Sequence, residues 1–143
     1  MRILVVEDNV EFYKGYFLRI LGNLVPTEKI EFEHADTLEK GLLNLCLPWD
    51  MIVLDHAFPK NARFPIDDPR GRIVKNGADL AEIRRKLEAD PNNNLKPTVI
   101  MAISSTQVGN REIAAKSGDA TLCYLKLQVP EMAKAINVAM GAP

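Results

Sequence analysis

The sequence has 143 residues, of which 47% are hydrophobic and 26% are charged, the balance of an ordinary globular domain. Eighteen basic and nineteen acidic residues leave a net charge of −1, which argues against bulk electrostatic binding to nucleic acid or an anionic membrane. The sequence shows no apolar run of membrane-spanning length, no secretory signal peptide and no disulfide framework. We therefore expect one cytoplasmic domain over residues 1–143, with little room for a second.

Short apolar runs alternate along the chain with patterns typical of amphipathic helices. The runs typical of buried strands are, in chain order, residues 3–6, 30–34, 51–54, 98–103 and 122–127. The helices that follow them are predicted over 10–24, 38–46, 80–87, 110–116 and 130–139. Asp36 with Glu39 suits a capping box at the start of the second helix, and Pro130 suits the first turn of the last.

Five β–α units predict an α/β fold, a doubly wound parallel sheet with helices on both faces. In such sheets, ligands bind beyond the carboxyl ends of the strands. The polar residues that follow the apolar runs at these ends are Glu7, Asp8, Asp55, Ser104 and Ser105, and Lys126 lies at the end of the fifth run. The sequence therefore places three carboxylates, hydroxyl groups and an ammonium group at one edge of the sheet.

These residue types suit one kind of chemistry. Three close carboxylates repel one another unless a hard cation such as Mg²⁺ lies between them. An aspartate held beside that cation can attack phosphorus as a nucleophile, and a lysine can neutralise the charge on the phosphoryl oxygens. The set predicts a phosphoryl acceptor.

Each residue also has a simpler explanation when it is taken alone. Asp8 or Asn9 suits the N-cap of the first helix, and Asp55 suits an ordinary loop. Lys126 suits a solvated surface charge, and Ser104 suits a turn. The combination carries more weight, because four separate strand ends supply what one mechanism needs.

Almost the whole chain resembles the receiver domain of two-component response regulators, in its stand-alone, CheY-like form. The resembling motifs are MRILVVEDN at 1–9, WDMIVLDHAFP at 49–59, NGADL at 76–80, PTVIMAISS at 97–105, SGDA at 117–120 and YLK at 124–126. The resemblance implies a flavodoxin-like, three-layer α/β/α fold with strand order 2-1-3-4-5. It also implies that the domain is not a conventional enzyme, although it catalyses its own phosphorylation and dephosphorylation.

The resemblance also assigns roles to the residues of the site. It makes Asp55 the phosphoacceptor and implies that Asp8 and Asp55 bind Mg²⁺ directly, while Glu7 acts mainly through water. The backbone carbonyl of Ala57 would complete the protein ligands. By the same likeness, Lys126 and Ser104 would each contact a phosphoryl oxygen.

The partners implied are a histidine kinase or histidine phosphotransfer protein as donor and a downstream protein as target. We expect no direct nucleic-acid binding and no membrane insertion, and the class allows a homodimer. One alternative is a receiver-like interaction module that works without phosphorylation. The other is a metal-dependent phosphohydrolase, which commonly needs a second aspartate where this chain has Ala57.

Three positions depart from the family pattern. Leu127 stands where proline usually follows the lysine, and Cys123 stands at the usual aromatic switch position, with Tyr124 one residue later. Strand alternation would send Cys123 and Tyr124 to opposite faces, so the sequence leaves the switch residue open. Ser105 is an alternative to Ser104 as the hydroxyl residue.

The largest departure is an insertion of about fourteen residues at 60–75, in the loop after the third strand. It carries five basic and two acidic residues, and its prolines and Gly71 predict a loop or small hairpin. It is either a tolerated surface insertion or a functional arm. As an arm, it would bring Arg63, Arg70 or Arg72 to the phosphoryl group or to an acidic partner.

The remaining candidates are predicted to be structural. His34 and His56 have no nearby metal ligands in sequence, although His56 is close enough to Asp55 to affect dephosphorylation. Cys46 and Cys123 are expected to be apolar packing residues. Trp49 is expected to pack at the start of the third strand.

Overall fold

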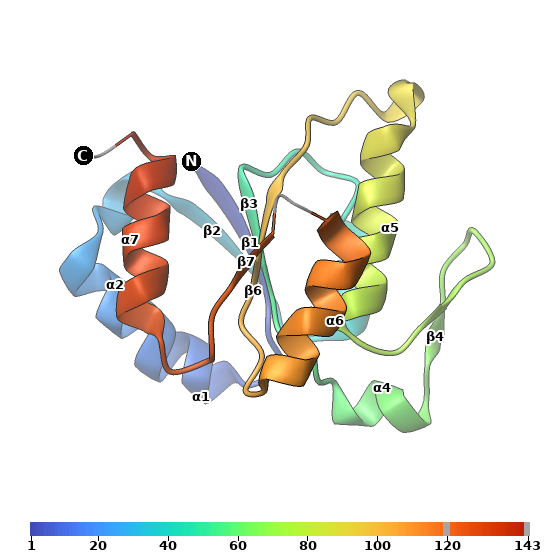
Figure 1. Ribbon diagram of the computed structural model, residues 1–143, viewed down its shortest axis with the longest axis horizontal. Helices are drawn as coiled ribbons and strands as arrows, with labels where there is room; N and C mark the ends of the chain where they lie inside the picture. Colours follow the sequence, from blue (N-terminus) through green and yellow to red (C-terminus); the bar gives the residue numbers. More distant parts are fainter. Residues whose placement is uncertain (119–120, 142–143) are drawn as a thin grey trace.

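A five-stranded parallel sheet forms the centre of the computed structural model, which describes residues 1–118 and 121–141 (Figure 1). Its strands are β1 (Arg2–Val6), β2 (Glu31–Ala35), β3 (Met51–Leu54), β6 (Val99–Ala102) and β7 (Thr121–Cys123). They lie in the order β2-β1-β3-β6-β7. Since β4 and β5 form a separate hairpin, this is the predicted order 2-1-3-4-5, and the flavodoxin-like fold is confirmed.

Helices cover both faces of the sheet, as the alternating pattern predicts. The helices are α1 (Val10–Phe12), α2 (Leu18–Leu24), α3 (Leu38–Asn44), α4 (Pro59–Arg63), α5 (Gly77–Ala89), α6 (Gln107–Ser117) and α7 (Val129–Ala139). A π-helical turn at Tyr13–Phe17 joins α1 to α2, and two 3₁₀ turns lie at Thr27–Lys29 and Pro91–Asn93. In Figure 1, α2 and α7 cover one face, and α5 and α6 cover the other. None of the helices in the described residues is long and apolar enough to cross a membrane.

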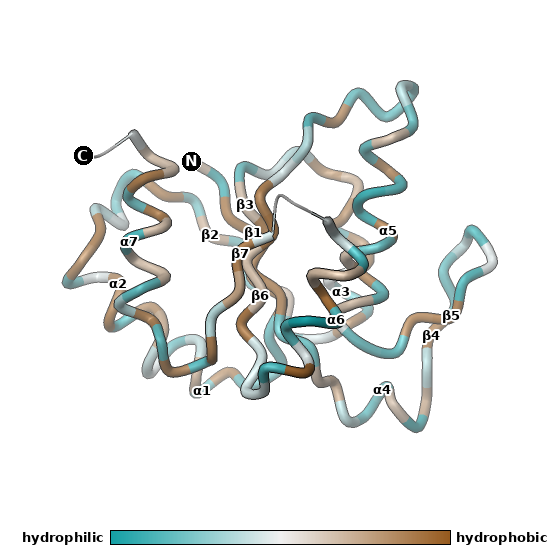
Figure 2. The backbone as a smooth tube through the Cα atoms, in the orientation of Figure 1, coloured by the Kyte–Doolittle hydropathy of each residue, from teal (hydrophilic) through white to brown (hydrophobic). Residues whose placement is uncertain are grey.

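Two apolar cores lie on the two faces of the sheet. Ile3 and Val5 pack with residues of α2 and α7, whereas Leu4 and Val6 pack with residues of α3, α5 and α6. All four side chains are fully buried. In Figure 2 the central strands are mainly hydrophobic, and the helices around them are of mixed polarity. The continuous apolar run at residues 3–6 therefore reflects a strand buried on both sides.

The helix caps confirm one sequence alternative and correct one prediction. The side chain of Asn9 caps α1 by accepting a hydrogen bond from the Phe12 N–H at 3.0 Å. The cap of α3 is Thr37, not the expected Asp36, because Thr37 Oγ1 accepts from the Lys40 N–H at 3.1 Å. Asp36 instead pairs with the ammonium group of Lys40 at 2.7 Å.

Buried Arg84 connects α5 by hydrogen bonds to the segments that precede β3 and β6. Its guanidinium group donates to the carbonyls of Leu45 and Leu47, both at 2.6 Å, and to Thr98 Oγ1 at 2.8 Å. It also pairs with Glu88 at 2.9 Å. A fully buried arginine is tolerated here because its donors are hydrogen-bonded.

The insertion folds into a short helix and a hairpin. The hairpin, formed by β4 (Ile66–Asp67) and β5 (Ile73–Val74), matches the predicted small hairpin. The sequence does not predict the preceding α4, but Pro59 occupies its first turn, where proline is well tolerated. Val74 is fully buried beside α5, so it anchors the base of the hairpin while the tip projects from the body (Figure 1).

Several further sequence predictions need correction. The fifth strand is expected over 122–127, but β7 ends at Cys123, and Lys126 lies in the following turn. Helix α6 begins at Gln107 rather than at 110, because Thr106 caps it. Cys46 and Cys123 are exposed rather than packed, since one lies in the turn after α3 and the other on an edge strand. Residues 119 and 120 of the SGDA motif lie outside the described residues.

Candidate functional site

Three carboxylates meet at the carboxyl edge of the sheet. Glu7 and Asp8 follow β1, and Asp55 follows the neighbouring β3. Each offers one oxygen, and these oxygens lie within 4.8 Å of one another. Glu7 and Asp55 are buried, whereas Asp8 is exposed. The predicted convergence of these three residues is therefore seen in the structure.

Lys126 supplies the cation that faces this cluster. Its Nζ lies 2.9 Å from Glu7 Oε1 and 3.2 Å from Asp55 Oδ2. The same ammonium group lies 5.1 Å from the centre of the Phe12 ring, a favourable cation–π geometry. In the turn that carries it, the Leu125 N–H donates to Gln128 Oε1 at 2.7 Å. Lys126 therefore reaches the site from the loop after β7, rather than from the strand itself.

Burial raises the pKa of both buried acids of the site. Burial, followed by the charge of Asp55, raises the pKa of Glu7 to about 7. Burial also raises the pKa of Asp55 above its ordinary value, against the opposing charge and hydrogen bond of Lys126. Burial alone would lower the pKa of Lys126, but its contacts with Glu7 and Asp55 raise it.

The carboxylate cluster fits a hard divalent cation. Glu7 Oε2 is buried and has no hydrogen-bond partner among the described residues, so it leaves an oxygen free in the site. Three carboxylates with such a free oxygen are the donor set that Mg²⁺ prefers. Ala57 lies in the same loop two residues after Asp55, where the metal role of its carbonyl stays a prediction.

The loop after β3 is held close to the start of α5. The His56 N–H donates to Asp55 Oδ1 at 2.8 Å, and the His56 carbonyl accepts from the Gly77 N–H at 2.9 Å. A Cβ atom on Gly77 would lie only 1.9 Å from the Asp55 carbonyl oxygen. Glycine in the NGADL motif is therefore required by this close approach of two backbones.

Ser104 is buried at the end of β6, and the start of α6 fixes its backbone. Its N–H donates to Asn110 Oδ1 at 2.8 Å, and its hydroxyl oxygen accepts from the Thr106 N–H at 3.1 Å. The Asn110 amide also donates to the Tyr124 carbonyl at 2.8 Å. Ser104 is buried and Ser105 is exposed, and the role of Ser104 as the hydroxyl residue stays a prediction.

The structure separates the two candidates for the switch position. Tyr124 packs with the apolar core that includes residues of α2 and α7. Cys123 contacts α6 instead, with its Sγ 3.7 Å from the Asn110 carbonyl. The residue on the α6 side of β7 is therefore a cysteine and not an aromatic side chain.

Both histidines have partners that the sequence does not indicate. His34 Nε2 donates to the Glu7 carbonyl at 2.8 Å, and the His34 ring stacks on Tyr13 with centroids 3.9 Å apart. His56 Nε2 donates to Glu112 Oε2 of α6, also at 2.8 Å. Glu112 is not among the predicted site residues, because no spacing rule links it to the loop after β3.

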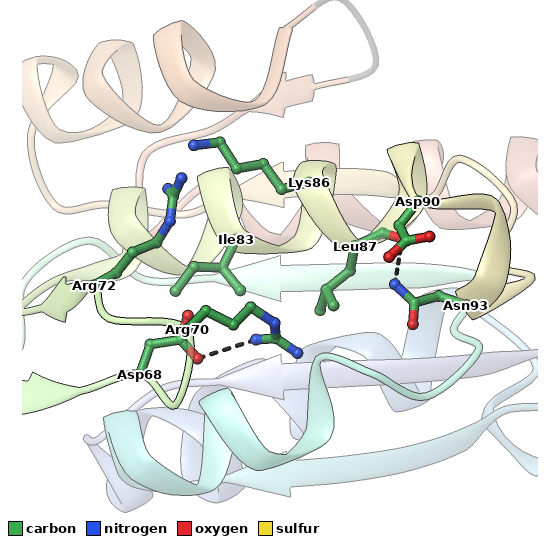
Figure 3. A pocket seen from close by; sticks show the side chains of 8 residues that line it. All are labelled: Asp68, Arg70, Arg72, Ile83, Lys86, Leu87, Asp90 and Asn93. Atoms are coloured by element: carbon green, nitrogen blue, oxygen red, sulfur yellow. Dashed lines mark hydrogen bonds and ion pairs between the residues drawn. The ribbon is translucent and has the colours of Figure 1, made fainter.

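The arginines of the hairpin are engaged beside α5 (Figure 3). Arg70 pairs with the buried Asp68 at 3.0 Å. Arg72 pairs with Glu82 of α5, also at 3.0 Å. Both arginines line a pocket of about 340 Å³ along α5. These pairs leave Arg63, exposed at the end of α4, as the arginine of the predicted arm without an ion pair among the described residues.

A second pocket lies directly beside the loop that follows β3 and Asp55. It has a volume of about 380 Å³ and is lined by His56, Ala57, Phe58, Pro59, Ala62, Lys75 and Asn76. Its walls thus come from the residues that follow Asp55 and from both ends of the insertion. The insertion therefore shares a pocket with the residues that directly follow Asp55.

Comparison with solved structures identifies the fold. The receiver domain of a DNA-binding response regulator (merR) from Colwellia psychrerythraea has a TM-score of 0.64 and 19% identity, covering 99% of this chain and 98% of that one. The Francisella response regulator 1452 receiver domain has a TM-score of 0.61 and 19% identity, covering 98% and 96%. A Burkholderia pseudomallei response regulator, solved with a phosphorylated aspartic acid, a calcium ion and citrate, has a TM-score of 0.56 and 15% identity, covering 99% and 75%.

Sequence comparisons add no further relatives. No protein-family model and no curated protein sequence matches this chain. The structural likeness covers nearly the whole chain, and it shows that the chain has the receiver-domain fold of response regulators.

Proposed function

We propose that the protein is a single-domain response regulator that accepts a phosphoryl group on Asp55 in a Mg²⁺-dependent reaction. The observation that carries this proposal is the placement of Lys126 Nζ against both Glu7 and Asp55, at 2.9 and 3.2 Å. One acidic acceptor, two acidic neighbours and one cation at the end of a parallel sheet are the groups that phosphoryl transfer to aspartate requires.

The reaction forms one bond and breaks one. A carboxylate oxygen of Asp55 attacks the phosphorus atom, and the donor leaves with the electron pair of its bond to phosphorus. From a phosphohistidine donor the leaving atom is a ring nitrogen of the histidine, which takes up a proton from water to give a neutral imidazole. The product is an aspartyl phosphate that water later hydrolyses to aspartate and inorganic phosphate.

The residues around Asp55 stabilise charge on the transferred group. Lys126 already contacts one carboxylate oxygen of Asp55, and the His56 N–H holds the other. Ser104 is the predicted hydroxyl donor for a phosphoryl oxygen. Glu7, Asp8 and Asp55 would hold Mg²⁺, which when bound supplies positive charge to the phosphoryl oxygens. The phosphorylated aspartic acid and calcium ion in the Burkholderia structure support this assignment.

Two other functions fit the site less well. A phosphorylation-independent interaction module would not need the buried Glu7 and Asp55 facing one lysine, because buried charges are costly to keep. A phosphohydrolase of the expected type lacks its second aspartate, since that position is Ala57. We therefore do not class the protein as a conventional enzyme.

The proposed donor is a histidine kinase or histidine phosphotransfer protein, and the output is binding to a downstream protein partner in the cytoplasm. A homodimer would be one form of that output. Direct binding to nucleic acid is not part of the proposal, because the chain carries a net charge of −1.

The decisive experiment is incubation with Mg²⁺ and acetyl phosphate, followed by mass spectrometry of the intact protein. We expect the mass gain of one phosphoryl group, which Asp55→Ala abolishes and Asp67→Ala, at an exposed position in the hairpin, retains. No mass gain would favour the phosphorylation-independent module. Rapid turnover of phosphate esters would favour the hydrolase.

A further inference from the structure

One residue, His56, links the phosphoacceptor to two helices. Its N–H is bonded to Asp55 Oδ1, its carbonyl to the N–H of Gly77 at the start of α5, and its ring to Glu112 of α6. Each of the three bonds is 2.8 or 2.9 Å long. Because a carboxylate only accepts, His56 Nε2 is the donor to Glu112.

The side of α6 that carries Glu112 also packs tightly against Ser104 and His56. A Cβ atom on Gly109 would lie 2.3 Å from Ser104 Oγ and 3.0 Å from the Cβ and Cγ atoms of His56. Glu112 follows Gly109 by three residues, so the two lie on the same side of the helix. Asn110, between them, holds the Ser104 N–H. The first two turns of α6 are thus joined to both loops that border Asp55.

We propose that the hydrogen bond between His56 and Glu112 is a latch that holds α6 in its present position while Asp55 is unphosphorylated. His56 and Glu112 are then positioning residues for the phosphorylation switch. This inference rests on the proposed phosphorylation of Asp55.

Phosphorylation of Asp55 would offer new hydrogen-bond acceptors to the His56 N–H and to Ser104. A phosphoryl group brings negative charge and additional acceptor oxygens next to the His56 N–H and Ser104. The Ser104 hydroxyl now accepts from Thr106, and the Ser104 N–H is held by Asn110 of α6. A shift of Ser104 toward the new oxygens would therefore displace α6, because Ser104 is hydrogen-bonded to it. The bond between His56 and Glu112 opposes this displacement.

The hydrogen bond between His56 and Glu112 is weak enough to break when α6 moves. The His56 side chain is 21% exposed and that of Glu112 is 45% exposed, so water weakens their attraction. On the side of α6 that faces β7, the contacting residue is Cys123 and not an aromatic side chain. On the side of α6 that faces the phosphoacceptor loop, the contacting residue is His56.

The test compares Glu112→Ala with the wild-type protein, using beryllofluoride with Mg²⁺ as a phosphoryl mimic. Loss of one hydrogen bond to a charged acceptor should raise the affinity for the mimic roughly two- to tenfold. Hydrogen exchange of the α6 amides should be faster without the mimic and should converge on the wild-type rate with it. Fluorine NMR of the bound mimic measures the affinity.

Four further variants serve as controls for this test. His56→Ala should reproduce the effect, and the double variant should add little to either single change, because both remove one interaction. His56→Gln retains an amide donor and should restore part of the wild-type behaviour. Glu131→Ala, at an exposed position on α7, should leave the affinity unchanged.

The outcomes separate the latch from the proposed function. Wild-type protein that gains no phosphoryl mass from acetyl phosphate would refute the function and the latch together. Normal phosphorylation with unchanged mimic affinity in Glu112→Ala would overturn the latch alone. A lower melting temperature without any change in affinity or α6 exchange would overturn it too, because it would show that the pair only stabilises the fold.

Discussion

The ammonium group of Lys126 lies 2.9 Å from Glu7 Oε1, although 119 residues separate them in the sequence. The same group also contacts Asp55, so one cation faces two buried carboxyl groups. Burial, followed by the charge of Asp55, keeps the pKa of Glu7 high, and one lysine cannot neutralise both carboxyl groups. The first two predictions follow from it.

Lys126→Met should slow phosphorylation of Asp55 by acetyl phosphate at least about tenfold, because the charge beside the acceptor is lost. At pH 8 it should also lower the free energy of unfolding by about 1–3 kcal/mol, since two buried carboxyl groups lose their partner. Mass spectrometry and urea unfolding measure the two effects. Lys134→Met, at an exposed position on α7, is the control and should change neither.

Without metal, the free energy of unfolding should fall as the pH rises from about 4.5 to 7. In this interval folded Glu7, with its pKa near 7, keeps a proton that the unfolded chain releases near its ordinary value of 4.5. The folded state thus binds more protons, so rising pH favours unfolding, by an amount on the order of 2–3 kcal/mol. Urea unfolding across this range measures the slope. Glu7→Gln should flatten it, and an equal slope in that variant would contradict the assignment.

Gly77→Ala should destabilise the fold by more than about 2 kcal/mol, because the added Cβ meets a backbone carbonyl that has no room to move. Gly22→Ala is a matched control in α2, where nothing lies within 4 Å of the position that a Cβ atom would take. That change should stabilise the protein by about 0.5–1 kcal/mol, the usual gain of alanine over glycine in a helix. Thermal and urea unfolding compare the two variants.

Arg84→Met should cost about 3–5 kcal/mol of stability, because it leaves the Leu45 and Leu47 carbonyls and the Glu88 carboxylate without their buried donor. Arg111→Met, at an exposed position on α6, is the control and should change stability by no more than about 0.5 kcal/mol. Urea unfolding distinguishes them. Equal losses in the two variants would show that the guanidinium contacts of Arg84 are not what stabilises this region.

Deletion of residues 63–75 should alter the rate of phosphotransfer from a protein donor or the rate of dephosphorylation, if the insertion acts as an arm. Because the deletion also removes buried Val74, Arg63→Glu tests the same idea with the fold intact. Repulsion of an acidic donor should then slow transfer from a phosphorylated histidine phosphotransfer domain, while acetyl phosphate reacts normally. Unchanged rates with both donors in both variants would make the insertion a tolerated surface loop.

The fold and the acidic centre of the site follow from local patterns in the sequence. Apolar runs at 3–6 and 51–54 predict strands buried on both faces, and the acids behind them must then meet at one edge. Lys126 lies at the end of the last apolar run, which predicts that it belongs to the site. In the structure β7 ends three residues before it. The prediction succeeds because a parallel sheet fixes the relative positions of its strand ends.

What the sequence could not supply are contacts between side chains on different elements. The bond between His56 and Glu112 depends on the packing of α6, which Gly109 sets through tertiary contacts. The exposure of Cys46 and Cys123 depends on where a helix and a sheet end. The pairing of Arg70 with Asp68 depends on the turn of the hairpin.

The position of Lys126 also has a consequence for synthesis of the chain. The ribosome produces the three carboxylates of the site within the first 55 residues, and their cation follows 71 residues after Asp55. β7 must then pair with β6 before Lys126 reaches them. A nascent chain that has already folded its central strands thus holds an acidic cluster without its lysine, and under the proposed function it becomes competent to receive a signal only when the edge strand docks.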